Sequence, residues 1–161
     1  MNFKRAWIQL RMFTFQSGIK RTAYLKRKNV FGSIGEKVML QSRKVPLYPE
    51  LIFIGNNVRV ASNVSFITHD VTHNMLNNIP EYVEGKGYSF QEKKGKIVIG
   101  DNVFIGANST LLYDVTIGNN VIIGAGSVVT KDIPDGTVCA GAPCRLIGRF
   151  EDFVEKKKQM N

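Results

Sequence analysis

The chain has 161 residues, of which 43% are hydrophobic; this suffices for one folded domain with its own core and excludes a disordered chain. The net charge is +9, and the two cysteines, Cys139 and Cys144, form neither a CxxC pair nor a disulfide framework. No apolar stretch is long enough for a signal peptide or a membrane span, so we expect a reduced, cytoplasmic protein.

The positive charge is concentrated at the N-terminus. Residues 1–28 contain eight basic side chains, and the first acid in the chain is Glu36. We predict a short helical basic arm over residues 1–29. Three interpretations stay open: a solvated helix face, a surface that lies on anionic lipid headgroups, and a collector of phosphorylated ligands. Nucleic-acid binding is not expected.

From residue 97 the sequence repeats every six residues. Neither a helix of period 3.6 nor a hairpin meander has this period, whereas one short strand and one turn per unit does. Three units make a triangular coil of 18 residues, and stacked coils form a parallel β-helix. The aliphatic positions are Ile99, Ile105, Leu111, Ile117, Ile123 and Val129, and the turn positions are Asn102, Asn108, Asp114, Asn120, Gly126 and Asp132.

The same period precedes an aperiodic segment. It covers residues 54–71, with a weaker trace at "IGEKVML", and fails over residues 72–96. We therefore predict one domain over residues 1–161, with the β-helix over 30–148, an inserted loop over 72–96 and a C-terminal helix over 149–161. Long loops in compact domains tend to be functional.

Stacking at 18 residues predicts a ledge of small residues. Gly106 lies over Gly124, and Ala107 lies over Ala125, so a slim ligand could touch backbone amides there. The alternative is that small residues only ease the packing of the corner.

Both histidines lie in "SFITHDVTHN". His69 takes a turn position of the repeat immediately before the inserted loop, which predicts an outward-pointing functional side chain, although an ordinary polar corner is the alternative. His73 is assigned to the loop. Two histidines are too few for the three protein ligands of a catalytic zinc, so no metal site is expected.

Two stretches, "IGNNVRVASNVSFITHD" and "IGDNVFIGANSTLLYDVTIGNNVIIGAGSVVTKDIPDGTVCAGAPCRLIG", resemble the hexapeptide-repeat acyltransferases. The resemblance is to the maltose/galactoside acetyltransferases and to O-acetyltransferases of bacterial polysaccharides. It implies an all-β, left-handed parallel β-helix that assembles as a homotrimer. It also implies acetyl-CoA as co-substrate and direct transfer to a hydroxyl, as in polysaccharide biosynthesis.

The resemblance also assigns roles to individual residues. His69 would be the general base, and the Ala107 amide would face the thioester. Residues that hold the acceptor in the sugar acetyltransferases have no match here, so the acceptor stays open. The positions matched to the coenzyme A site are Gly106, Ala107, Gly124, Ala125, Thr130, Lys131, Pro143 and Arg145.

Other activities stay open beside this one. An amino-sugar N-acetyltransferase, an antibiotic acetyltransferase and a serine acetyltransferase share the fold, and a non-catalytic β-helical scaffold with a membrane-binding arm would share the period. A covalent acyl-enzyme is not expected, because Cys139 and Cys144 lack a histidine partner in the pattern and Ser127 is at a core position.

Overall fold

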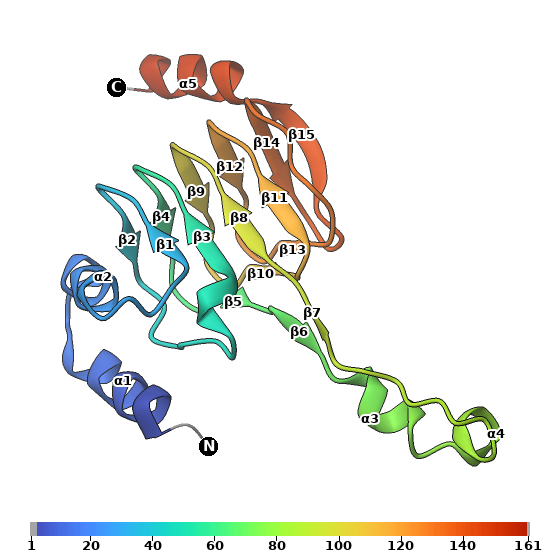
Figure 1. Ribbon diagram of the computed structural model, residues 1–161. Helices are drawn as coiled ribbons and strands as arrows, with labels where there is room; N and C mark the ends of the chain where they lie inside the picture. Colours follow the sequence, from blue (N-terminus) through green and yellow to red (C-terminus); the bar gives the residue numbers. More distant parts are fainter. Residues whose placement is uncertain (1–2, 161) are drawn as a thin grey trace.

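The computed structural model describes residues 3–160, and its centre is a triangular prism of stacked coils (Figure 1). Three mainly parallel sheets form the faces of the prism, in the orders β1-β3-β8-β11, β2-β4-β9-β12-β14-β15 and β5-β10-β13. Paired residues of successive complete coils are 18 apart, as in Ile97↔Val115 and Thr110↔Val128. The predicted parallel β-helix and its coil length are confirmed.

The strands are short, since each supplies one side of a coil. The first face contains β1 (Ser33–Ile34), β3 (Ile52–Ile54), β8 (Ile97–Ile99) and β11 (Val115–Ile117). The second contains β2 (Met39–Leu40), β4 (Arg59–Val60), β9 (Val103–Ile105), β12 (Val121–Ile123), β14 (Thr137–Ala140) and β15 (Arg145–Arg149). The third contains β5 (Ser65–Phe66), β10 (Thr110–Leu111) and β13 (Val128–Val129).

The repeat works because each unit buries two side chains and turns once. Ile105 and Ile123, one above the other, are completely buried in a single core that fills the prism. At the turns, Asn102 and Asn120 adopt the left-handed backbone with φ of 57° and 55°, a conformation that asparagine tolerates. Their side chains also stack, since Asn102 Nδ2 donates to Asn120 Oδ1 at 2.9 Å.

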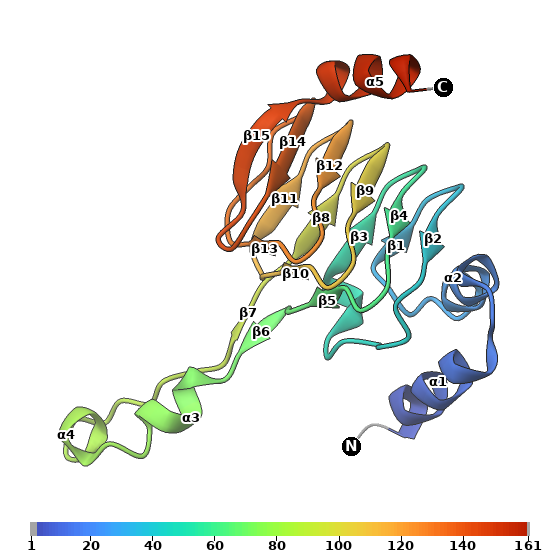
Figure 2. The same ribbon diagram turned by 180° about the vertical axis from the view of Figure 1, so that it is seen from behind.

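Two helices cover the N-terminal end of the prism. α1 (Phe3–Thr14) is followed by α2 (Gly18–Arg27), which packs against β2 (Figure 2). The buried Arg21 of α2 donates to the carbonyl oxygens of Leu40 and Gln41, and Thr22 Oγ1 accepts the Leu40 amide. These bonds provide partners for backbone groups at the edge of the first coil, next to β2. Residues 1 and 2 of the predicted arm lie outside the described residues.

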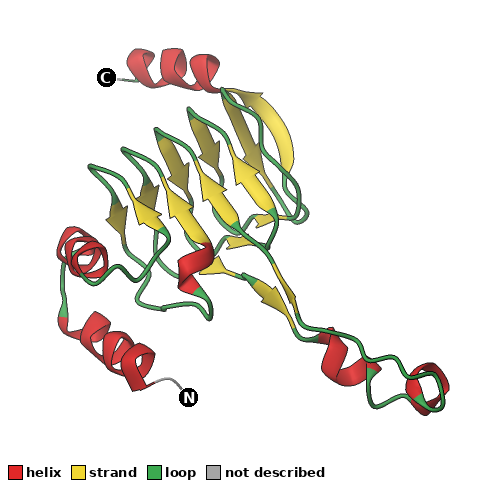
Figure 3. Cartoon of the chain, in the orientation of Figure 1, coloured by secondary structure: helices red, strands yellow, loops and turns green. Residues whose placement is uncertain are grey.

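The segment predicted as a loop has secondary structure of its own. β6 (His69–Asp70) and β7 (Lys93–Lys94) pair in an antiparallel ribbon, which carries α3 (Thr72–Leu76) and α4 (Pro80–Val83) away from the prism (Figure 3). An aperiodic, polar sequence did not predict these short elements, because a ribbon is held by pairing between distant residues. The all-β description is therefore too narrow.

The C-terminal end of the prism is closed by a hairpin. β15 turns back antiparallel to β14, and α5 (Phe150–Gln159) follows. This agrees with the predicted C-terminal helix, whose last residue, 161, lies outside the described part of the chain. None of the helices described is both long and apolar enough to cross a membrane.

Candidate active site

His69 begins the excursion from the prism instead of forming a corner. It is the first residue of β6 and pairs with Lys94, while Gly95 N donates to Thr68 O at 3.0 Å to close the base of the ribbon. Its backbone is not in the left-handed region adopted at the equivalent corner by Asp114. The predicted turn position of His69 is therefore wrong, because the chain must stay extended to leave the coil. The side chain is half-buried outside the prism core.

The His69 imidazole packs against Tyr48, which is linked to two charged side chains. The Tyr48 ring stands edge-on to it, with ring centres 5.4 Å apart. Tyr48 Oη lies 3.0 and 2.9 Å from the two carboxylate oxygens of Glu92. Lys94 Nζ lies 3.0 Å from Glu92 and 4.0 Å from the centre of the Tyr48 ring. The end of the ribbon and the segment before β3 thus form one wall around His69.

The charges in this wall are matched. The hydrogen bond from Lys94 holds the pKa of Glu92 below its usual range, and the bond from Tyr48 and the nearby His69 act in the same direction. The hydrogen bond to Glu92 in turn raises the pKa of Lys94. Glu92 is therefore a carboxylate at neutral pH, and its charge is already partnered.

Asp70, the neighbour of His69 in sequence, is bonded elsewhere. Its Oδ1 accepts the Thr72 amide at 2.6 Å and its Oδ2 accepts the Tyr113 hydroxyl at 3.1 Å. The bonds from Thr72 are the main reason that the pKa of Asp70 is lowered. His69 Nδ1 is buried and has no hydrogen-bond partner within the part of the chain that the structure describes. Packing against Tyr48 therefore orients the ring.

A cavity of about 410 Å³ opens beside His69. Helix α1 forms one wall with Arg5 and Gln9, and the coil containing β5 forms the opposite wall. Its size suits a small polar molecule such as a sugar. The lining residues are Arg5, Gln9, Lys44, Val45, Pro46, Leu47, Val64, Ser65, Phe66, Ile67 and His69.

The predicted ledge has the predicted stacking. The pair Ile105↔Ile123 puts Gly106 over Gly124 and Ala107 over Ala125, and Gly106 N donates to Ile123 O at 2.8 Å. These residues lie at the corner between the β9–β12 face and the β10–β13 face, just before β10.

One chain does not bring the ledge and His69 together. Ala107 precedes the β5–β10–β13 face and His69 follows it, so the full width of that face separates them. Thr130 and Lys131 follow β13 as His69 follows β5, so both lie along the same edge as His69 and are exposed. Pro143 lies in the connection from β14, and the exposed Arg145 begins β15.

The other candidate nucleophiles are poorly placed for chemistry. Burial raises the pKa of the Cys139 thiol to about 12, and the hydrogen bond with Cys144 adds to this effect. Ser127 is buried and donates its hydroxyl to Gly124 O at 2.6 Å. Over residues 3–160, no group of three His, Cys, Asp or Glu side chains is arranged to hold a metal ion. His73 lies in α3, apart from the ledge.

Sequence reasoning missed Tyr48, Glu92 and Lys94. Tyr48 lies outside the repeats, and the other two lie in the aperiodic segment, where period carries no information. One signal could have found Lys94. Because the coil resumes after the excursion, the two ends of the excursion must meet. Lys94, at one end, must then lie beside His69, at the other.

Comparison with known proteins agrees with this fold. Residues 96–131 match the family model described as bacterial transferase hexapeptide (six repeats). A putative acetyltransferase, YvoF, of Bacillus subtilis (strain 168) is 32% identical over 154 residues, which are 94% of this chain and 79% of that protein. The galactoside O-acetyltransferase of Escherichia coli (strain K12) is 46% identical over 103 residues, 63% of this chain and 45% of that enzyme.

A solved structure matches nearly the whole chain. It is a galactoside acetyltransferase in complex with coenzyme A, with a TM-score of 0.59 and 28% identity over 96% of this chain and 86% of that one. The 18-residue coils, the stacked glycines and these similarities agree with one another. The chain therefore belongs to the hexapeptide-repeat acetyltransferases, a family whose fold is the left-handed parallel β-helix.

Proposed function

We propose that the protein transfers an acetyl group from acetyl-CoA to a hydroxyl of a sugar or surface polysaccharide, with His69 as general base. The observation that carries this proposal is the half-buried imidazole at the edge of a cavity of about 410 Å³. The family supplies the reaction class, and the coenzyme A complex of a related galactoside acetyltransferase supports the co-substrate.

The chemistry is a direct transfer. Neutral His69 takes the proton of the acceptor hydroxyl while the oxygen attacks the thioester carbon. The carbon–sulfur bond then breaks, and the imidazolium returns the proton to the leaving thiolate. Such base catalysis contributes roughly a hundred- to ten-thousand-fold. The Ala107 N–H, in the turn after β9, would donate to the oxygen on which negative charge develops.

The two halves of this site come from different edges of the prism. His69 and Ala107 lie on opposite edges of the β5–β10–β13 face. We therefore propose a homotrimer, in which the ledge of one chain faces His69 of its neighbour. Coenzyme A would lie along the ledge at Gly106, Gly124 and Ala125. Because the exposed Thr130 and Lys131 lie on the same edge as His69, the neighbouring chain would contribute them to the phosphate-bearing end, where the exposed Pro143 and Arg145 would also lie.

The N-terminal helix α1 of the basic arm exposes apolar side chains that bear on where the enzyme works. Trp7, Leu10 and Phe13 are 63%, 61% and 62% exposed on α1, and Arg11 of the same helix is exposed too. A helix that exposes apolar side chains together with a cation suits the surface of an anionic bilayer. We propose that the enzyme works in the cytoplasm, in polysaccharide biosynthesis, and rests on the membrane through this arm. It should sediment with vesicles containing phosphatidylglycerol and stay in solution with phosphatidylcholine alone; equal behaviour with both would refute membrane contact through charge.

The reaction is tested by thiol release from acetyl-CoA over a panel of sugar, amino-sugar and serine acceptors. The parent, His69→Ala and His73→Ala are compared, since the second histidine controls for loss of an imidazole on the same ribbon. We expect only His69→Ala to abolish turnover. Equal loss in both variants would reject His69 as the base, and transfer only to amines or serine would reject the sugar O-acetyltransferase.

A further inference from the structure

The cavity beside His69 is lined by cations and by no acid. Its lining contains Arg5 and Lys44 and neither Asp nor Glu. The nearby carboxylate of Glu92 is already held by Lys94 and Tyr48. An anion entering the cavity would therefore meet two positive charges and no unpartnered carboxylate.

The two cations are held on a braced wall. Arg5 Nε donates to Pro46 O at 3.1 Å and its Nη2 to Val45 O at 3.0 Å, which leaves Nη1 free of these bonds. Gln9, one turn later on α1, donates to Arg43 O at 2.7 Å and accepts the Val45 amide at 2.7 Å. α1 and the segment that carries Lys44 are thus fixed to each other.

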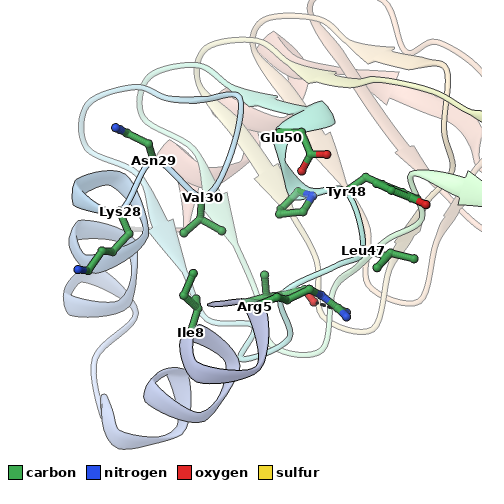
Figure 4. A pocket seen from close by; sticks show the side chains of 10 residues that line it. Arg5, Ile8, Lys28, Asn29, Val30, Leu47, Tyr48 and Glu50 are labelled. Atoms are coloured by element: carbon green, nitrogen blue, oxygen red, sulfur yellow. Dashed lines mark hydrogen bonds between the residues drawn. The ribbon is translucent and has the colours of Figure 1, made fainter. Parts of the chain in front are cut away.

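A second cavity nearby has a different set of charged residues in its lining. It has a similar volume, about 410 Å³, and shares Arg5, Val45 and Leu47 with the first (Figure 4). Its lining includes Glu50 opposite Lys28, so its charge is mixed. Of these two cavities, the one that reaches His69 has cations and no acid in its lining.

We propose that the acceptor carries a negative charge, a carboxylate or a phosphate, which Arg5 and Lys44 bind while a hydroxyl is presented to His69. This rests on the proposed function and specifies its substrate. Charged hydrogen bonds from arginine and lysine are stronger than neutral ones, and they would select an acidic sugar or a sugar phosphate over a neutral sugar.

The test compares three acceptors: methyl galactoside, galactose 1-phosphate and galacturonic acid. The variants are Arg5→Gln and Lys44→Gln, and Lys156→Gln is the matched control because it removes an exposed charge on α5 that lines neither cavity. Lys44 is exposed, so its replacement leaves the wall intact even if Arg5→Gln loosens α1. Acceptor binding is also measured by calorimetry, so the result does not depend on turnover.

We expect a charged acceptor to bind more tightly than methyl galactoside. Lys44→Gln should lower the affinity and kcat/KM for the charged acceptor about tenfold, the effect of one lost charged hydrogen bond. The affinity and kcat/KM for methyl galactoside should not change, and Lys156→Gln should behave like the parent with all three acceptors. A response to galactose 1-phosphate alone identifies a phosphate, and one to galacturonic acid alone a carboxylate. Equal binding of all three acceptors, unchanged in Lys44→Gln, would overturn the inference. If the proposed enzyme activity itself were wrong, the result would be different: thiol release from acetyl-CoA would not depend on His69 with any of the acceptors.

Discussion

Gly106 is a point where one coil of the β-helix comes very close to the next, and replacing it by alanine should destabilise the protein. A methyl group there would lie 2.7 Å from both Ala125 Cα and the Gly124 carbonyl carbon. Ordinary van der Waals contact begins near 3.4 Å. The two coils would have to separate by several tenths of an ångström to accept it.

Backbone hydrogen bonds on both sides resist this separation. Gly106 N donates to Ile123 O at 2.8 Å, and Gly126 N donates to Ala107 O at 2.8 Å. Overpacking of this kind costs about 1–3 kcal/mol, and a weakened backbone hydrogen bond adds about 1 kcal/mol. Alanine also lowers the conformational entropy of the unfolded chain, which stabilises the folded protein by about 0.4–1 kcal/mol. We expect Gly106→Ala to lower the free energy of unfolding by about 2 kcal/mol, the balance of these effects.

The measurement is urea unfolding at one fixed protein concentration. Gly148→Ala is the matched control, because a methyl group at that position would meet no atom within 4 Å. The control should unfold at the parent's urea midpoint or slightly above it. Should Gly106→Ala unfold together with Gly148→Ala, the coils would not be packed at this spacing, and the ledge would lose its geometric basis.

Three further predictions concern the ribbon and the buried thiol. Tyr48→Phe keeps the ring beside His69 but removes the hydroxyl that donates to Glu92. In steady-state kinetics kcat should therefore fall a few-fold while the KM for acetyl-CoA stays constant. An unchanged kcat would show that the Tyr48 hydroxyl does not help to position His69. The pKa values of Asp70 and Glu92 are lowered in the folded protein, so their stabilisation is present at neutral pH and is lost as the pH falls below the ordinary values of 3.8 and 4.5 and through the folded ones. Hydrogen exchange of the ribbon should then rise in acid before that of the prism, and simultaneous opening would contradict this. The Cys139 thiol, with its pKa raised to about 12, should resist iodoacetamide at pH 8 until the protein unfolds, as read by mass spectrometry; rapid labelling of the folded protein would show that it is accessible.

The candidate site shows where sequence reasoning stops. The stacking of Gly106 over Gly124 followed from the period, because strand pairing at 18 residues places them in register. The position of Tyr48 beside His69 did not follow from any period. It depends on the path of the segment before β3 and on the ribbon that brings Glu92 back, and both are set by contacts between distant residues.

The amino-acid sequence by itself determined the coil: which residues are buried, where each turn falls and which small residues stack. The reason is that these features depend on neighbours six residues away, and on asparagine's tolerance of the left-handed backbone. Only the tertiary structure decided that His69 is extended at the base of a ribbon, and that α1 closes a cationic cavity beside it. Those arrangements join residues from 21 positions apart (Tyr48 and His69) to 64 positions apart (Arg5 and His69), and no local pattern in the chain encodes such contacts.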